Sequence, residues 1–252
     1  MNSNSLIEAL DMPASSRVDQ RVPKKLLIEN GAPTAADKRL INDGIEALLW
    51  LAALKPTTIG VSEYRDDVRE YLEIAVLCLT LRDAAKATRL VELVHRAVPY
   101  PLLLLTEQEE RIGLSAAHKR WSQGEMGKTV LEGDVVSVEW EAAHDDEHWP
   151  NFCDALALGK QPRSTLYALY QGWIDTLLAL QAARVSGAFA VAANTEHATA
   201  RRDALQEIAR LDSEIARLRA TAAKEKQISR RVELNLQLKR VEAAQAVARA
   251  KL

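Results

Sequence analysis

The sequence predicts an α+β fold, a largely antiparallel sheet flanked by helices and followed by a C-terminal helical hairpin. The first observation is that helical and strand-like patterns alternate as helix, strands, helix, strands in the first part of the chain. The second is that residues 188–252 contain neither Gly nor Pro and are rich in strong helix formers. The third is charge: residues 194–252 carry 13 Lys and Arg against 8 Asp and Glu, a net of +5, while the rest carries 20 against 27, a net of −7. We therefore expect an acidic body with a basic helical tail.

Composition excludes several classes of protein. Of the 252 residues, 48% are hydrophobic and 27% charged, which is typical of a globular protein with a core. The net charge of −2 excludes a polycation that coats nucleic acid. No apolar run reaches the length of a membrane span, and the N-terminus lacks the pattern of a secretory signal. Two cysteines, Cys78 and Cys153, cannot form a disulfide framework, so we expect a cytoplasmic protein.

The first elements are short. Ser5–Leu10 forms a helical turn, and Thr34 can cap a helix that runs to about Asn42, because an acid follows three residues later. The apolar segment Ile45–Lys55 fits a strand or a helix, and Trp50 and the following Pro-Thr-Thr turn favour a strand.

The middle of the chain contains the clearest strand. Tyr71–Leu81 is an almost continuous apolar run, which predicts a central strand buried on both faces. Asp83 opens a helix over Ala84–Ala97, whose apolar residues recur at helical spacing before Pro99. Further strands follow, separated by a polar turn over Glu107–Glu110 and a loop over Gly124–Gly127: Leu102–Thr106, Arg111–Lys119 and Val135–Trp140.

The C-terminal third is expected to be helical. Helices are predicted over Phe152–Leu158 and from Ser164 to about Arg184. Two heptad series follow, and their phase changes between Ala222 and Leu234. Both a hairpin and one long helix with a stutter fit this change; the similar length of the arms favours the hairpin, with Ser229 capping the second arm. The expected parts are an α+β body (1–145), a helical connector (146–190) and the hairpin (191–252).

Searches for catalytic motifs give no site. Gly127-Lys128-Thr129 matches the end of a phosphate-binding loop, but Ser122 stands in place of the first Gly, and a strand-like segment follows. His144-Asp145-Asp146-Glu147-His148 contains five metal-ligand types, yet an acidic surface loop explains it equally well. A restriction-type nuclease needs a Glu-x-Lys pair on a strand, and the run from Glu73 lacks the Lys. We expect no catalytic residue, no metal and no cofactor.

The tail carries a cluster of basic residues near the phase change. Lys224, Lys226, Arg230 and Arg231 stand there against Glu225 alone. Elsewhere in the tail Glu residues alternate with the cations, which is typical of a solvated helix. In a hairpin the basic cluster would lie at the tip, where it could meet phosphates or an acidic protein surface.

Several segments together resemble an uncharacterised bacterial domain family encoded beside Swi/Snf-type helicases and DNA methyltransferases in restriction-like phage-defence loci. The resemblance runs in order along nearly the whole chain. This sequence departs from the family at Ile228, where the family often has an aromatic residue. It departs again at Leu81-Arg82, where the family has a strand end that carries a Lys. The segments that carry it are Pro13–Lys24, Trp50–Ile59, Glu73–Val76, Ala97–Leu104, His118-Lys119 and Lys224–Asn235.

The resemblance implies a biological context and no chemistry. We expect a non-catalytic accessory subunit of a phage-defence assembly whose helical hairpin binds a helicase or methyltransferase, or else nucleic acid, without contact to a membrane. The expected binding residues are Lys224, Lys226, Gln227, Arg230, Arg231 and Asn235. Two alternatives remain open: a divergent restriction-type nuclease with a degenerate site, and a coiled-coil protein that forms homo-oligomers through the C-terminal helices.

Overall fold

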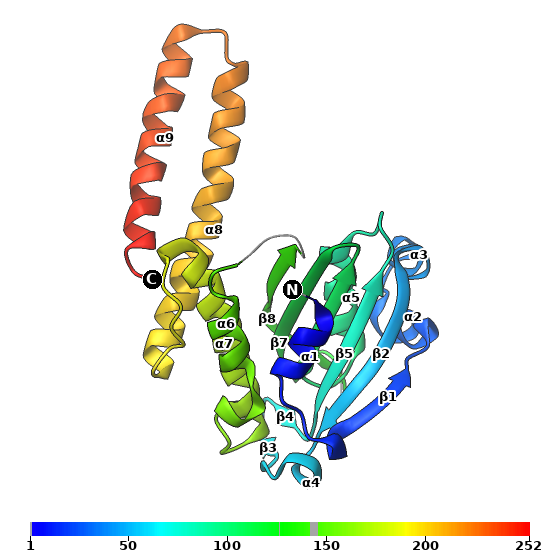
Figure 1. Cartoon of the computed structure of the whole chain (residues 1–252). Coiled ribbons are helices and arrows are strands. Elements are labelled where there is room, and N and C mark those ends of the chain that lie inside the picture. The colour runs from blue at the N-terminus through cyan, green and yellow to red at the C-terminus, as the bar shows by residue number, and fades with distance from the viewer. Residues whose placement is uncertain (1, 126, 142–145) are drawn as a thin grey trace. The chain divides into compact units, whose positions relative to one another are not determined.

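The computed structural model describes residues 2–125, 127–141 and 146–252. It divides into two compact units, Met1–Leu177 and Leu178–Leu252 (Figure 1). The predicted α+β fold, with two long C-terminal helices that pack together, is confirmed. The three-part division expected at residues 145 and 190 stays a prediction, and its first boundary lies outside the described residues.

The first unit is built on a six-stranded sheet in the order β1-β2-β5-β6-β7-β8. All neighbouring strands run antiparallel except β5 and β6, which are parallel and joined through helix α5. Strands β3 and β4 form a separate two-stranded ribbon. The strands are β1 (Arg17–Arg21), β2 (Ile45–Leu54), β3 (Tyr64–Arg65), β4 (Glu70–Tyr71), β5 (Ile74–Leu81), β6 (Leu102–Gln108), β7 (Arg111–Trp121) and β8 (Thr129–Glu141).

Helices cover both faces of the sheet. Helices α2, α3 and α5 bury a core of aliphatic side chains against β2, β5 and β6. On the other face Trp140 of β8 packs edge-on against Trp149 and tilted against Phe152, both from α6. The helices are α1 (Ser3–Ala9), α2 (Lys24–Gly31), α3 (Ala35–Gly44), α4 (Pro56–Ile59), α5 (Ala87–Ala97), α6 (Trp149–Leu156) and α7 (Leu166–Ser186), with 3₁₀ turns at Ala14–Ser16 and Leu158–Lys160.

The central strand is confirmed. Every residue of β5 except the half-buried Thr80 is buried, as its continuous apolar sequence predicts. Thr34 caps α3, because its Oγ1 accepts a hydrogen bond from the main-chain N–H of Asp37 at 3.1 Å. Residues 45–54 form a strand, which decides between the two alternatives left open for this segment.

Several predicted boundaries are wrong. Tyr71 belongs to the short strand β4, outside the central strand. Helix α5 begins only at Ala87, so Asp83 does not open it. Glu107 lies within β6 because its main chain pairs with Ile112 of β7, and strand β8 begins at Thr129, six residues before the predicted start.

The C-terminal unit contains the end of α7 and a helical hairpin, which excludes the single long helix. Helix α8 (Thr195–Lys224) ends at a short segment, Glu225–Gln227, and helix α9 (Ile228–Arg249) returns beside it (Figure 1). The predicted cap at Ser229 is wrong: α9 begins one residue earlier, and no side chain caps it. Within the described residues, no helix is both long and apolar enough to cross a lipid bilayer.

Candidate functional site

The hairpin buries one heptad series from each arm. Ile208, Leu211, Ile215 and Leu218 of α8 are each at most 5% exposed, and Leu234 and Ala248 of α9 are also buried. Across the seam, the Arg219 guanidinium forms an ion pair with Glu242 at 2.7 Å, and the Gln245 amide donates to Asp212. This packing makes the hairpin a two-helix arm with a defined end at residues 225–227.

The six residues expected to bind a partner gather at that end, and we call them the tip cluster. Lys224 is the last residue of α8, Lys226 and Gln227 lie in the connecting segment, and Arg230, Arg231 and Asn235 lie in the first turns of α9. All six are exposed. The structure thus brings the predicted residues together, because the chain reverses its direction among them.

The charges of the tip cluster are mostly free. Lys224, Lys226 and Arg231 make no ion pair with any described residue, whereas Arg230 pairs with Glu233 at 2.6 Å. The only acid between Lys224 and Arg231 in the sequence is Glu225, which accepts a hydrogen bond from the main-chain N–H of Gln227. The N-terminal end of α9 and the C-terminal end of α8 meet at the tip, so their helix dipoles offset each other and the side-chain charges dominate. The tip cluster is therefore suited to bind an anionic group, and Arg230 contributes less than its position in the sequence suggested.

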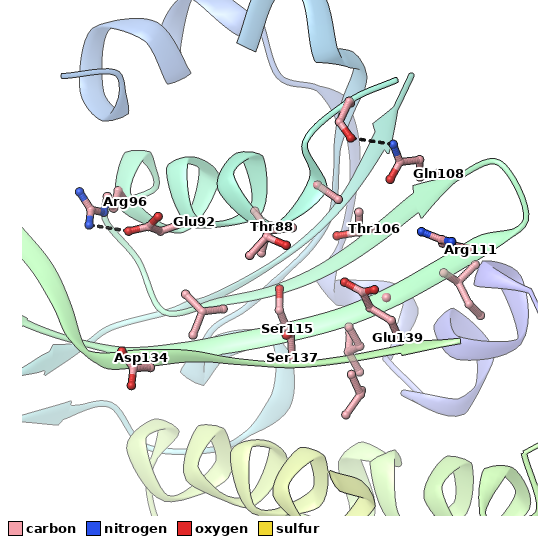
Figure 2. Close-up of a pocket in the computed structure, with 18 of the residues that line it drawn as sticks. Thr88, Glu92, Arg96, Thr106, Gln108, Arg111, Ser115, Asp134, Ser137 and Glu139 are labelled. Carbon is pink, nitrogen blue, oxygen red and sulfur yellow. Dashed lines mark hydrogen bonds and ion pairs between the residues drawn. The ribbon is translucent and has the colours of Figure 1, made fainter. Parts of the chain in front are cut away.

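The first unit contains a second candidate, which we call the sheet-face groove. It lies where the outer part of the sheet extends beyond α5 and has a volume of about 650 Å³ (Figure 2). Thr88, Glu92 and Arg96 of α5 line one side, and strands β6, β7 and β8 form the floor. Small side chains keep the floor open, because Gly113 and Ser115 of β7 stand where larger residues would fill it.

Both arginines of the sheet-face groove are paired with carboxylates. The Arg96 guanidinium contacts Glu92 at 2.5 Å, and Arg111 lies 3.6 Å from Glu141. On the floor, the buried Ser115 hydroxyl is 2.9 Å from His95 Nε2. Burial lowers the pKa of His95 to about 3, so its ring is neutral and a weak base. This Ser–His pair lacks an orienting acid, since His95 Nδ1 has no hydrogen-bond partner among the described residues.

A buried lysine that no sequence pattern predicted connects two segments of the family resemblance. Lys119 of β7 donates from Nζ to the main-chain oxygens of His95 and Val98, at the C-terminal end of α5. Burial lowers its pKa to about 7. The lysine thereby satisfies helix-end carbonyls that would otherwise lack a donor. A Lys within an apolar strand is itself the signal that could have identified this contact.

The neighbouring His118 connects other parts of the first unit. Its Nδ1 lies 2.6 Å from the hydroxyl of Tyr71, and its Nε2 lies 2.7 Å from Gln171 Oε1. Tyr71 comes from β4 and Gln171 from α7, so one side chain connects the ribbon, the sheet and a helix. Because these polar groups satisfy one another, the network stabilises the fold and leaves no group poised for chemistry.

The motifs considered for catalysis lie in surroundings that do not match the catalytic sites they resemble. Thr129, the end of the phosphate-loop match, opens strand β8, so no helix N-terminus follows it. Glu73 is buried and pairs with Lys55 at 3.0 Å. Burial raises the pKa of the Cys78 thiol to about 12. In the tract of residues 144–148, residues 144 and 145 lie outside the described residues. Among all the described residues of the chain, no three His, Cys, Asp or Glu side chains form a group that could hold a metal ion.

Comparison with known proteins places the chain in a family. A model of a domain of unknown function, DUF4391, matches residues 10–244. The chain belongs to this family. No curated protein and no solved structure matches the chain. The match covers both the first unit and most of the hairpin, so the tip cluster is part of the family domain.

Proposed function

We propose that this DUF4391 protein is a non-catalytic accessory subunit of a bacterial phage-defence assembly. In this role the helical hairpin is an interaction arm, and the tip cluster binds an anionic surface of a partner. The observation that carries the proposal is the set of three exposed cations, Lys224, Lys226 and Arg231, that have no ion pair with a described residue and lie at the end of the arm. Unpaired cations at a defined position favour specific over diffuse contact.

An acidic patch on a helicase or DNA methyltransferase is the first candidate for this surface. The resemblance of the sequence to a family encoded beside such enzymes supports it. The phosphates of DNA or RNA are the second candidate, because lysine and arginine side chains also bind phosphates. The net charge of −7 outside the hairpin disfavours nucleic acid that wraps around the whole chain, and so restricts either ligand to the arm.

A charge-reversal variant tests the proposal. Changing Lys226, Arg230 and Arg231 to Glu should weaken binding to the purified helicase or methyltransferase encoded nearby, or to duplex DNA, by at least about tenfold, since each contact to a charged group contributes on the order of 1 kcal/mol or more. A matched control changes the exposed Lys25, Lys38 and Arg39 of the first unit to Glu, which alters the net charge equally. Circular dichroism checks that the helices persist.

Four outcomes would contradict the proposal. Equal loss in the control would show that only net charge matters, and unchanged binding in the tip variant would show that the tip is an ordinary solvated turn. Mg²⁺-dependent DNA cleavage by the isolated chain, lost in Glu73→Ala, would instead establish the divergent nuclease. Light scattering that shows a stable oligomer with no partner binding would establish the coiled-coil protein.

A further inference from the structure

Helix α9 has a second apolar face that the hairpin does not bury. The four most exposed large hydrophobic side chains of the described residues all lie on it, Ile228 (71%), Val247 (62%), Leu236 (54%) and Val232 (52%). Their spacings of four, four and eleven residues place them along one side of a helix. We call this set the outer stripe.

The outer stripe lies opposite the seam of the hairpin. At 100° per residue, Leu234 and Ala248 of the seam point about 180° away from the centre of the outer stripe. α8 therefore cannot cover it while it packs against the seam. A helix that is apolar on two opposite sides is typical of the middle helix of a three-helix contact.

The charges beside the outer stripe indicate the chemistry of the missing partner. Lys239 lies within the stripe, between Leu236 and Val247, and Arg240 lies along its edge; neither makes an ion pair with any described residue. The carboxylates of α9 are already engaged, Glu233 by Arg230 and Glu242 by Arg219. The stripe therefore presents aliphatic side chains beside unpaired positive charge.

We propose that the outer stripe docks an acidic amphipathic helix of a partner protein, which completes a three-helix bundle. The occupant would place aliphatic residues against the stripe and Asp or Glu beside Lys239 and Arg240. The proposal rests on the proposed role of the hairpin as an interaction arm, and it specifies the structure that this arm recognises.

Two other occupants fit the surface less well. A second copy that paired its own stripe antiparallel would bring two sets of Lys239 and Arg240 together near the middle of the contact, where like charges repel. An anionic membrane would accept the positive charge, but the apolar residues of the stripe are all aliphatic, so it lacks the aromatic anchors common in interfacial helices.

The test uses the full chain and a synthetic four-heptad peptide with Leu at the core positions and Glu at the flanking positions. Fluorescence anisotropy should detect binding of this peptide and no binding of a matched peptide with Lys in place of Glu. The variant Val232→Gln with Leu236→Gln, which keeps the charge and does not lower helix propensity, should weaken binding at least about tenfold. The matched control places Gln at the exposed Ala209 and Ala216 of α8 and should bind normally.

Each other result would overturn the docking proposal. Equal binding of the two peptides would remove the charge argument, and equal binding by the stripe variant would place the contact elsewhere. Concentration-dependent dimerisation that the stripe variant abolishes would make a second copy the occupant. Binding to vesicles of phosphatidylcholine and phosphatidylserine that the same variant abolishes would make it a membrane. The tip charge-reversal variant is measured separately against DNA and the partner enzymes, so failure of the stripe and failure of the proposed function are distinguishable.

Discussion

Single buried polar residues connect the elements of the first unit. Lys119 binds two carbonyls at the end of α5, and His118 connects Tyr71 with Gln171. Burying an amine in this way disfavours its charged form, which is why the pKa of Lys119 lies near 7, well below its usual range. Stability should therefore depend on pH through this residue.

Replacing Lys119 with Met should flatten the dependence of stability on pH. Between about pH 7 and 10 the unfolded chain keeps a proton on Lys119 that the folded chain has released, so the free energy of unfolding rises with pH, by at most about 1.4 kcal/mol per pH unit. Urea unfolding of wild type and Lys119→Met between pH 7 and 8.5 measures this slope.

The matched control for this slope is Lys25→Met, at an exposed position of α2. It should keep the slope of the wild type. The buried thiols, whose raised pKa values act in the opposite direction at alkaline pH, contribute equally to all three proteins. A Lys119→Met protein with the wild-type slope would show that the buried amine stays charged.

At the scale of elements, a small residue allows two helices to come into close contact. Gly31 at the end of α2 lies so near α5 that an added Cβ would be 2.5 Å from the Cβ of Ala97 and 2.8 Å from the main-chain oxygen of Leu93. Both contacts are shorter than van der Waals distances, and main chain cannot move aside readily.

Gly31→Ala should therefore destabilise the first unit by about 1–3 kcal/mol, the usual cost of overpacking. Gly124→Ala is the control, since an added Cβ there meets nothing within 4 Å. Thermal unfolding of the two variants gives the comparison. Equal melting temperatures would mean that α2 and α5 separate without cost.

The central strand offers a second prediction at this scale. Val76 is completely buried in β5, between neighbouring strands on both sides. Val76→Asp should cost several kcal/mol, because it buries a charge with no partner, and should unfold the first unit. Val76→Ala, which leaves only a cavity, should cost less. A Val76→Asp protein that keeps its melting temperature would contradict the packing of β5.

The spacing of apolar residues explains which elements can be predicted from the sequence. The buried run of β5 and the heptads of the hairpin are visible because burial demands them at fixed periods. β1 is not visible, since all five of its residues are exposed and only pairing with β2 makes it a strand. β8 continues past a break in its register near Ala116 of β7, and no local signal announces such an irregularity.

The candidate site is likewise predictable only where its features are local in the sequence. Clustered cations and a phase change in the heptads predict a basic tip, because both are local features of the sequence. Which cations are unpaired depends on rotamers, and so Arg230 differs from Arg231 only in the structure. The outer stripe is masked in the sequence by the stronger heptad series of the seam, although Ile228, Val232 and Leu236 are spaced at intervals of four.

For the whole molecule, charge is divided between the two parts of the chain. Residues 194–252 carry a net of +5, and the remainder carries −7. Such asymmetry orients the chain toward an anionic ligand and raises the rate of association, and both effects weaken as salt screens them. Salt dependence therefore distinguishes the two surfaces considered for the tip cluster.

Binding to duplex DNA through the tip cluster should show a defined dependence on salt. Three phosphate contacts, from Lys224, Lys226 and Arg231, predict a log–log slope of about −2.7, so raising salt from 50 to 200 mM should weaken binding about 40-fold. Lys226→Gln removes one contact and should make the slope shallower by about 0.9, whereas Lys25→Gln in the first unit removes the same charge and should leave it unchanged. Filter binding over this range gives all three slopes. A slope of DNA binding near zero would show that the tip cluster does not contact phosphates. If the tip charge-reversal variant then still abolishes association with a helicase or methyltransferase, the tip cluster binds an acidic protein surface.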